Sequence, residues 1–333
     1  MTGPASYRSS LHRYALAVAI LTGLLIFAGG LVTSTGSALA VPDWPLSFGT
    51  LFPHMTGGVL FEHGHRMLAG VVGLMTIGLT VWAWRVETRA WVRWLGVCSA
   101  AAVVLQAVLG GLTVLLRLPV EIAVSHAGLA QIFFCLNVTL ALVTSRGWLE
   151  APPRVPDAGT PSLRTLSLAT VAVVYVQILI GALVRHTGSG LAIPDFPTAF
   201  GRLWPPAATL NDSVAFQLAH RLGAVAVTAM VLWTAVAVVR RHGGIAALRR
   251  PALLLVLLLA WQIYLGAAII WTRRAVVPTT THVVSGALVL MTSLILALRV
   301  RRLLALARPV PHGRAATSAA STAPAPRSAS TAV

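Results

Sequence analysis

The chain has 333 residues, of which 57% are hydrophobic and only 10% are charged, and its mean hydropathy is +0.82. About a quarter of the residues of a soluble domain are charged, so this composition excludes an ordinary soluble protein and indicates an integral membrane protein. The formal net charge of +17 would suggest nucleic-acid binding in a soluble protein. In a membrane protein it reflects topology instead, and we expect no nucleic-acid partner.

Eight apolar stretches are long enough to cross a membrane as helices. They run roughly over 14–34, 65–84, 94–116, 122–145, 165–186, 213–239, 252–272 and 278–299. Most arginines lie at the termini and in every second connection, and the positive-inside rule places those segments in the cytoplasm. The sequence therefore predicts an all-α, multi-pass membrane protein with both termini cytoplasmic.

The spans divide the chain into two halves joined by a short linker. We expect a cytoplasmic N-terminus over 1–13, an N-terminal four-helix half over 14–145, a cytoplasmic linker over 146–164 and a C-terminal four-helix half over 165–302. Residues 303–333 are rich in Ala, Ser, Thr, Pro and Arg without apolar periodicity. This composition predicts a disordered cytoplasmic tail.

The first apolar run imitates a signal peptide, because Arg13 precedes it and the small residues Ala38 and Ala40 follow it. The run is longer than the usual apolar core of such a peptide, so we expect the first helix to remain in the mature protein. Cys98 and Cys135 both fall inside predicted spans, and no loop contains a cysteine. The sequence therefore predicts no periplasmic disulfide.

The chain contains an internal repeat. Segments 29–45 and 181–197 share 11 of 17 residues. The offset between the copies is 152 residues here and widens to 156 between His126 and His282, so four spans repeat in order. Because four is an even number, each half begins and ends on the same face, which predicts two parallel four-helix-bundle repeats. The repeated outer loops are either paired lids over a site or ordinary connections kept by duplication.

Four histidines stand at repeated positions in the first turn or two of the even-numbered spans, at the outer end. They are His65, His126, His220 and His282. A lone membrane histidine is more often a packing donor, but facing imidazoles in a membrane bundle are common axial ligands of haem iron. The repeat supplies two pairs, each drawn from two helices as bis-histidine haem ligation requires. Zinc fits less well without a Cys or carboxylate cluster, and copper stays open although no thiolate or methionine motif accompanies the histidines.

An arginine follows the first histidine of each pair. Arg66 comes directly after His65, and Arg221 comes directly after His220. A guanidinium at this place either pairs with a haem propionate or extends its charge to the membrane interface. Both interpretations predict that the two arginines lie at the outer end of their helices.

Glu62 and Gln217 take matching places in the two halves. Glu62 lies three residues before His65 and therefore shares its helix face. An amide cannot carry charge or relay protons, so the halves are alike in their histidines but unlike in acid-base capacity. Three further histidines lack repeat partners and are interpreted as interfacial or loop residues, namely His54, His63 and His186.

Together these motifs resemble haem A synthase. The resemblance covers about residues 10–300 and rests on Glu62-x-x-His65-Arg66, Gln217-x-x-His220-Arg221, His126, His282 and the doubled Leu-Val…Thr-Gly-Ser…Pro-Asp-x-Pro. It implies an eight-helix oxidoreductase of the bacterial inner membrane. Such an enzyme converts haem O to haem A for terminal oxidases by oxidising a porphyrin ring methyl group to a formyl group.

The same resemblance implies a role for each site residue. His220 and His282 would hold a resident haem b, with Arg221 beside it, while Glu62 would be the catalytic acid-base group. The substrate haem would bind at His65, His126 and Arg66. Implied partners are haem O, membrane lipid, haem O synthase, terminal oxidase assembly factors and a second copy of the chain. Many bacterial relatives have an outer-loop cysteine pair, but Ser47 stands here where a cysteine often stands, so thiol chemistry of that loop is absent.

Two other classes of protein remain open. A dihaem electron carrier of the cytochrome b kind would use all four histidines but gives no reason for Glu62 opposite Gln217. A transporter built from parallel repeats would use the histidines as proton relays. Extraction of bound haems from cells that make haem O separates the three classes.

Overall fold

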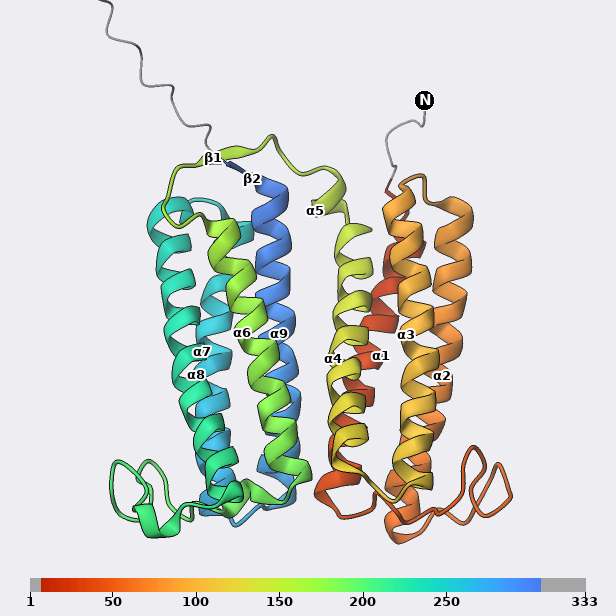
Figure 1. The fold of residues 1–333 in the computed structure, drawn as a ribbon. Helices are drawn as coiled ribbons and strands as arrows, with labels where there is room; N and C mark the ends of the chain where they lie inside the picture. The colour runs from red at the N-terminus through yellow and green to blue at the C-terminus, as the bar shows by residue number, and fades with distance from the viewer. Residues whose placement is uncertain (1–6, 307–333) are drawn as a thin grey trace, which may run out of the picture.

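The structure, a computed structural model, describes residues 7–306 as two four-helix bundles lying side by side (Figure 1). The first bundle contains α1 (Ser9–Ser34), α2 (Gly57–Val86), α3 (Ala90–Leu115) and α4 (Val120–Val143). The second contains α6 (Leu163–His186), α7 (Asp212–His242), α8 (Ala246–Trp271) and α9 (Val276–Leu303). All eight are long and apolar enough to cross a membrane. The prediction of an all-α protein with eight spans is confirmed.

The contacts between helices repeat in the two bundles. In each bundle the helices form a ring, so α2 lies across from α4, and α7 lies across from α9. Between the bundles α1 contacts α9, α4 contacts α6, and α4 contacts α9. Exchanging the halves leaves this set of contacts unchanged, as a two-fold axis along the helices requires. The predicted pair of parallel repeats is therefore confirmed.

Polar contacts join the two bundles across this interface. The guanidinium of Arg185 on α6 donates to the carbonyl of Gly30 and to the hydroxyl of Ser34 on α1, both at 2.9 Å. Nearer the middle of the helices, the Tyr175 hydroxyl donates to the carbonyl of Gly128 at 3.3 Å. These bonds fix the register of the halves where lipid offers no competing partner.

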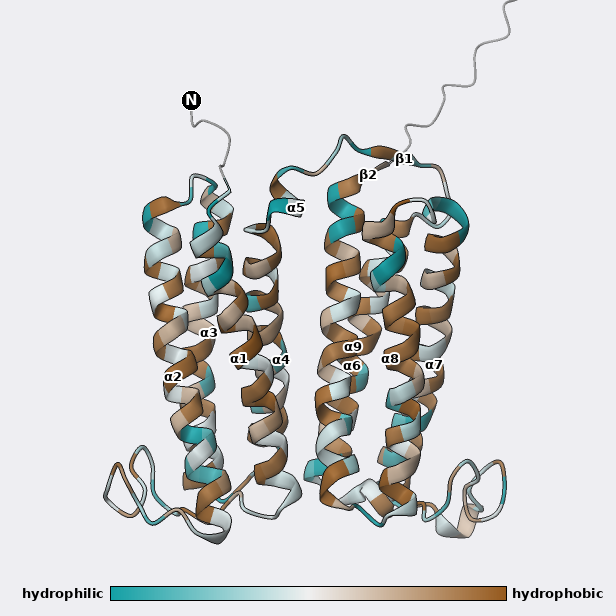
Figure 2. Cartoon of the chain, turned by 180° about the vertical axis from the view of Figure 1, so that it is seen from behind, coloured by the Kyte–Doolittle hydropathy of each residue, from teal (hydrophilic) through white to brown (hydrophobic). Residues whose placement is uncertain are grey.

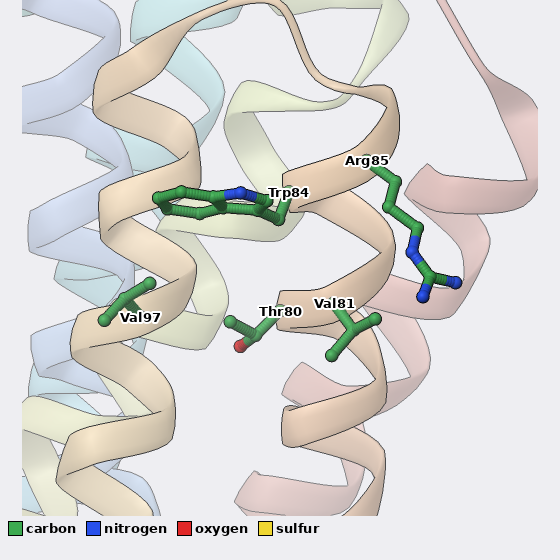
Figure 3. Close-up of a pocket in the computed structure, with 5 residues that line it drawn as sticks. All are labelled: Thr80, Val81, Trp84, Arg85 and Val97. Atoms are coloured by element: carbon green, nitrogen blue, oxygen red, sulfur yellow. The ribbon is translucent and has the colours of Figure 1, made fainter.

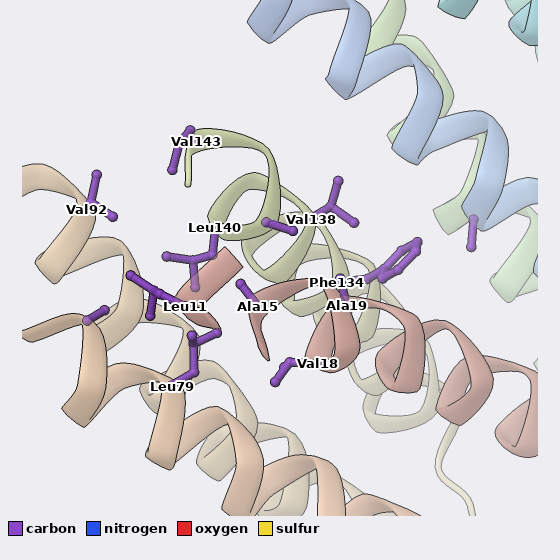
Figure 4. Packing of buried hydrophobic residues seen from close by; sticks show 13 residues of the cluster. Leu11, Ala15, Val18, Ala19, Leu79, Val92, Phe134, Val138, Leu140 and Val143 are labelled. Atoms are coloured by element: carbon purple, nitrogen blue, oxygen red, sulfur yellow. The ribbon is translucent and has the colours of Figure 1, made fainter. Parts of the chain in front are cut away.

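Hydrophobic residues prevail along the middle of the helices, and hydrophilic residues are more frequent toward their ends (Figure 2). In the first bundle Leu11, Leu79 and Leu140 come from three helices and pack in one buried cluster (Figure 4). Lipid tails are as apolar as leucine, so these contacts stabilise the bundle by close van der Waals packing rather than by removal from water.

Every spanning helix begins before its apolar run predicts, by one to eight residues. α2 begins at Gly57, eight residues before the expected start at 65, and the added turns contain the buried residues Glu62 and His63. A search for apolar runs does not include polar residues such as these, although they face protein rather than lipid and belong to the helix. α1 begins at Ser9, inside the expected N-terminal segment 1–13, whose first six residues lie outside the described range.

The linker and the end of α9 form a small sheet that the sequence does not predict. The linker contains α5 (Arg146–Leu149) and β1 (Val155–Asp157), and β1 pairs in parallel with β2 (Leu304–Leu306). The expectation of disorder from residue 303 is therefore wrong for 303–306. The partner strand lies far away in sequence, so local composition cannot reveal the pairing. The rest of the predicted tail, 307–333, lies outside the described residues.

Long loops cap both bundles at the end opposite the linker, at the bottom of Figure 1. Residues 35–56 join α1 to α2, and residues 187–211 join α6 to α7. The second loop contains two short 3-10 helices, η1 (Ser189–Leu191) and η2 (Ala207–Thr209). α1 begins and α9 ends at the other, upper end.

Candidate haem sites

The four repeated histidines come from helices that face each other diagonally within each bundle. His65 and His220 are the ninth residues of α2 and α7, and His126 and His282 are the seventh residues of α4 and α9. At 1.5 Å per residue they lie about 9–12 Å inside the helix starts. The expected first or second turn is right for His126 and His282, but His65 and His220 lie one turn deeper.

Each imidazole lies against a glycine of the helix that precedes its own. A Cβ added to that glycine would stand between 2.9 and 3.3 Å from the ring carbon Cε1. The pairs are Gly29 with His65, Gly110 with His126, Gly181 with His220, and Gly266 with His282. A real Cβ is rarely so close to another atom, so each ring occupies space that only glycine leaves free. Each half therefore contains two such glycine-lined spaces, one for each imidazole, and we call each space a glycine cradle.

The second pair of rings has a spacing that suits a shared metal. The ring centroids of His220 and His282 are 6.4 Å apart. An imidazole nitrogen binds a metal such as zinc at about 2 Å, which puts two rings on opposite sides of one ion about 6 Å apart. The equivalent helices and glycines hold His65 and His126 in the first bundle.

Unpaired nitrogens on these rings also fit a ligand. Among residues 7–306, Nδ1 of His65, His126 and His282 is buried and has no hydrogen-bond partner. A buried polar atom without a partner costs about 1–3 kcal/mol, which coordination would recover. No cluster of three or more metal-binding side chains exists within that range. The residues present therefore suit a group that brings its other four ligands with it, as haem does.

Glutamines contact three of the four rings. The Nε2 atom of Gln177 lies 3.0 Å from Nδ1 of His220 and donates to its carbonyl at 2.8 Å. Gln106 and Gln262 approach Nε2 of their histidines, at 3.3 Å for His126 and 3.2 Å for His282. The ring of His65 has no such side-chain partner within the described chain.

Glu62 and Gln217 hold the outer loops in the same way. The backbone N–H of Val41 donates to Oε2 of Glu62 at 2.8 Å, and the N–H of Ile193 donates to Oε1 of Gln217. The Gln217 amide also donates to the carbonyl of Gly190 at 3.0 Å. Both residues are 4% exposed. The position thus closes each loop onto its helix, and it carries a charge only in the first half.

Arg66 and Arg221 also bind the loops. Arg66 donates to the carbonyls of Asp43, at 2.7 Å, and Leu46, at 2.9 Å, and it pairs with Glu62 at 2.6 Å. Arg221 donates to the carbonyls of Asp195, at 2.6 Å, and Thr198, at 2.7 Å. Neither guanidinium simply extends toward the membrane interface. Each anchors a loop beside its histidine, and only Arg66 has a carboxylate partner.

An aspartate shapes the tip of each loop. The backbone N–H groups of Gly49 and Phe48 hold the pKa of Asp43 below its usual value. In the second loop, the Thr198 hydroxyl, together with two backbone N–H groups, lowers the pKa of Asp195 to about 2. Both carboxylates are therefore ionised at neutral pH, and the repeated Pro-Asp-x-Pro motif builds the same turn twice.

His63 is part of the first loop's anchor, which corrects its interpretation as an interfacial or loop residue. It lies in α2 at 6% exposure, and its Nδ1 is 2.8 Å from the hydroxyl of Ser47, which is fully buried. In the second half the matching positions are Ala199 and Leu218, which pack together in an apolar cluster. His54 is exposed in its loop, and His186 is the half-buried last residue of α6.

The outer ends of the two halves differ in charge. The first has the arginines Arg66 and Arg117 against the carboxylates Asp43, Glu62 and Glu121, a net charge of −1. The second has Arg185, Arg202, Arg221, Arg273 and Arg274 against Asp195 and Asp212, a net charge of +3. An anionic group is therefore favoured at the outer end of the second half.

A separate pocket of about 280 Å³ opens at the other end of α2 and α3 (Figure 3). Thr80, Val81, Trp84 and Arg85 of α2 line it together with Val97 of α3. Its walls are mostly apolar, and Thr80 is fifteen residues from His65 along α2. It is therefore not part of the histidine sites.

Fold and site together define a class of protein, a membrane protein of two repeated bundles with a paired-histidine site at the same end of each. A family model described as cytochrome oxidase assembly protein matches residues 56–295. The chain is 32% identical to the haem A synthase of Symbiobacterium thermophilum over 269 residues, which cover 78% of this chain and 85% of that protein. It is 30% identical to the haem A synthase of Geobacillus kaustophilus over 306 residues, which cover 88% and 93% of the two chains.

The chain belongs to the haem A synthase family. It is therefore a multi-pass membrane oxidoreductase of haem A biosynthesis, as the sequence resemblance implied.

Sequence reasoning missed the glycine cradles, the glutamine contacts and the loop anchors. Gly29, Gly181, Gly110 and Gly266 were visible as repeated residues, and so were Gln106 and Gln262. Their repetition beside the histidine-bearing spans was the available signal. Gln177 has no repeat partner and gave no such signal.

Proposed function

We propose that this enzyme converts haem O to haem A by oxidising one ring methyl group to a formyl group. The observation that carries the proposal is a pair of histidine sites with equal cradles and unequal surroundings. The matching glycine-lined spaces for the histidine rings suit one haem in each half. The difference between Glu62 and Gln217 suits a different role for each haem. Family membership supports the product, haem A.

The second half is the resident site, in which His220 and His282 bind haem b. The support is the +3 charge of its outer end, because haem carries two anionic propionates that arginines bind well. The first half, at −1, receives the substrate haem between His65 and His126. Arg66 and Arg221 serve the propionates only if they release some of their loop carbonyls.

A bound haem b supplies one-electron chemistry. Oxidation of a methyl group to a formyl group proceeds in two stages. Each stage takes up the oxygen of one water and releases two protons and two electrons, which leave by way of bound haem b for an external acceptor. The first stage gives an alcohol, and the second gives a hydrated aldehyde that loses water. Glu62 takes part by accepting a proton or by stabilising positive charge near the substrate. Its two oxygens accept from Arg66 and from the N–H of Val41, and each keeps a further lone pair.

The enzyme lies in the bacterial cell membrane with both termini in the cytoplasm and both sites near the periplasmic face. The arginine-rich linker and helix ends around 85–93, 146–164, 240–250 and 299–302 support this orientation. Haem O arrives from the membrane, which implies haem O synthase as the supplier and terminal oxidase assembly factors as recipients of haem A.

Haem extraction tests the proposal. The protein is expressed in cells that make haem O but lack their own haem A synthase, and extracted haems are separated by chromatography. New haem A supports the proposal. The equal cradles also suit a dihaem electron carrier, and accumulation of haem b with unchanged haem O would favour that function.

A further inference from the structure

The residue four positions before the glycine that each ring contacts is a glutamine for three of the four histidines and a leucine for the fourth. Gln177 on α6 meets the ring of His220, and the equivalent residue on α1 is Leu25, beside His65. On α1, His65 meets the backbone carbonyl of Leu25, which also accepts the helix hydrogen bond and is therefore shared between two donors. His126 and His282 both have a glutamine, so His65 alone has an apolar side chain at this place.

The residues that pack against Gln177 and Leu25 also differ between the two halves. A Cβ on Gly223, one turn after His220, would collide with Oε1 of Gln177. The equivalent residue in the first half is Leu68, which packs with Leu25 against the apolar cluster around Val72. One half therefore contains a Gln–Gly combination, and the other contains Leu–Leu in the same volume. Each combination fills its site, so the difference is not a packing defect.

We infer that Gln177 locks His220 as a permanent haem ligand and that Leu25 leaves His65 as the exchangeable one. Gln177 is a positioning residue. The inference rests on the proposed function, which assigns haem b to the second half and the substrate haem to the first. It adds the reason why one haem stays while the other enters and leaves.

The physical basis is hydrogen bonding to the nitrogen that does not bind iron. A partner on that nitrogen fixes the ring's tautomer and orientation and makes the ligand more basic, and its loss typically costs about 10–100-fold in affinity. An amide has both a donor and an acceptor, and Oε1 of Gln177 is buried and otherwise unpaired within residues 7–306. The leucine side chain offers neither group, so His65 has only the shared backbone carbonyl of Leu25. A substrate site must release its product, so a less firmly held ligand suits His65.

Gln177→Leu, which copies the first half, tests the inference through haem transfer from the purified protein to excess apomyoglobin. We expect haem b to leave about 10–100-fold faster than from the unmodified protein. We also expect its midpoint potential to rise, because a less basic imidazole stabilises the oxidised iron less. The matched control is Gln131→Leu, since Gln131 is a buried glutamine of α4 without a histidine contact among the described hydrogen bonds. It should leave both quantities unchanged.

The reciprocal variant is Leu25→Gln with Leu68→Gly, which makes room for the amide, and Leu68→Gly alone is its control. The double variant should retain a second, slowly released haem, and it does not alter the second half if Gln177→Leu fails to fold. Unchanged release and potential in Gln177→Leu, or no added retention in the double variant, would overturn the inference. Unmodified protein that binds no haem through His220 and His282 would instead refute the proposed function.

Discussion

Glu62 and Gln217 occupy the same place in the two halves and accept the same hydrogen bond, from the N–H of Val41 and of Ile193 respectively. Each therefore closes an outer loop over its histidine helix. Only Glu62 adds a negative charge, which it shares with Arg66 at 2.6 Å. The natural second half thus shows which substitution removes the charge and keeps the loop anchor.

Glu62→Gln should fold normally and keep haem b, because Gln217 makes the equivalent loop contact in the same protein. Conversion of haem O should fall by about 100- to 10,000-fold, the usual cost of losing a positioned acid-base group. Chromatography of extracted haems measures haem A against haem O and any hydroxylated intermediate. Near-normal haem A in a well-expressed variant would leave Glu62 with the loop-anchoring role alone.

Gly181→Ala should expel haem from the second half, because the new Cβ would stand 2.9 Å from Cε1 of His220. Crowding of this kind typically costs about 1–3 kcal/mol, and the ring must move to relieve it. Haem content per chain is the measurement. Gly190→Ala is the control, since a Cβ there meets no atom within 4 Å. Equal haem content in the two variants would mean that the cradle does not position the ligand.

Reporter fusions test the orientation. A fusion after Leu306 should report the cytoplasm, and an insertion at Leu203, which is 98% exposed in its loop, should report the periplasm. The reason is the excess of arginine at the linker end of the bundles. A periplasmic signal at residue 306 would reverse the proposed topology.

Asp195 should tie the second loop down over a wide pH range. The pKa of its carboxyl group is lowered to about 2, first by the Thr198 hydroxyl and then by backbone N–H groups. A lowered pKa contributes stability above the ordinary value of 3.8, and the contribution is lost as the pH falls through about 2. Hydrogen exchange at Phe200 and Gly201, compared with Asp195→Asn at each pH, should differ at pH 5 and converge near pH 2. A constant difference down to pH 2 would argue against this carboxylate as the cause.

The sequence predicted the repeat and the number of spans because both depend on apolar length and self-similarity. It misplaced the start of α2, since Glu62 and His63 are polar residues buried inside the protein. It also missed the β1–β2 pairing of 155–157 with 304–306. Such pairings depend on three-dimensional neighbours that no local pattern encodes.

The site was predictable as a set of residues but not as a set of contacts. Repetition singled out His65 and its three equivalents, yet it could not tell that Arg66 holds carbonyls of its own loop. It also gave no weight to Gln177, whose contact with His220 appears only when α6 and α7 pack together.

The haem content of four purified single variants tests the division between the two halves most directly. Reduced-minus-oxidised spectra and haem extraction are compared for His65→Ala, His126→Ala, His220→Ala and His282→Ala. Loss of haem b should be confined to His220→Ala and His282→Ala. His65→Ala and His126→Ala should keep haem b and yield no haem A. Equal loss of haem b from all four variants would contradict separate resident and substrate sites.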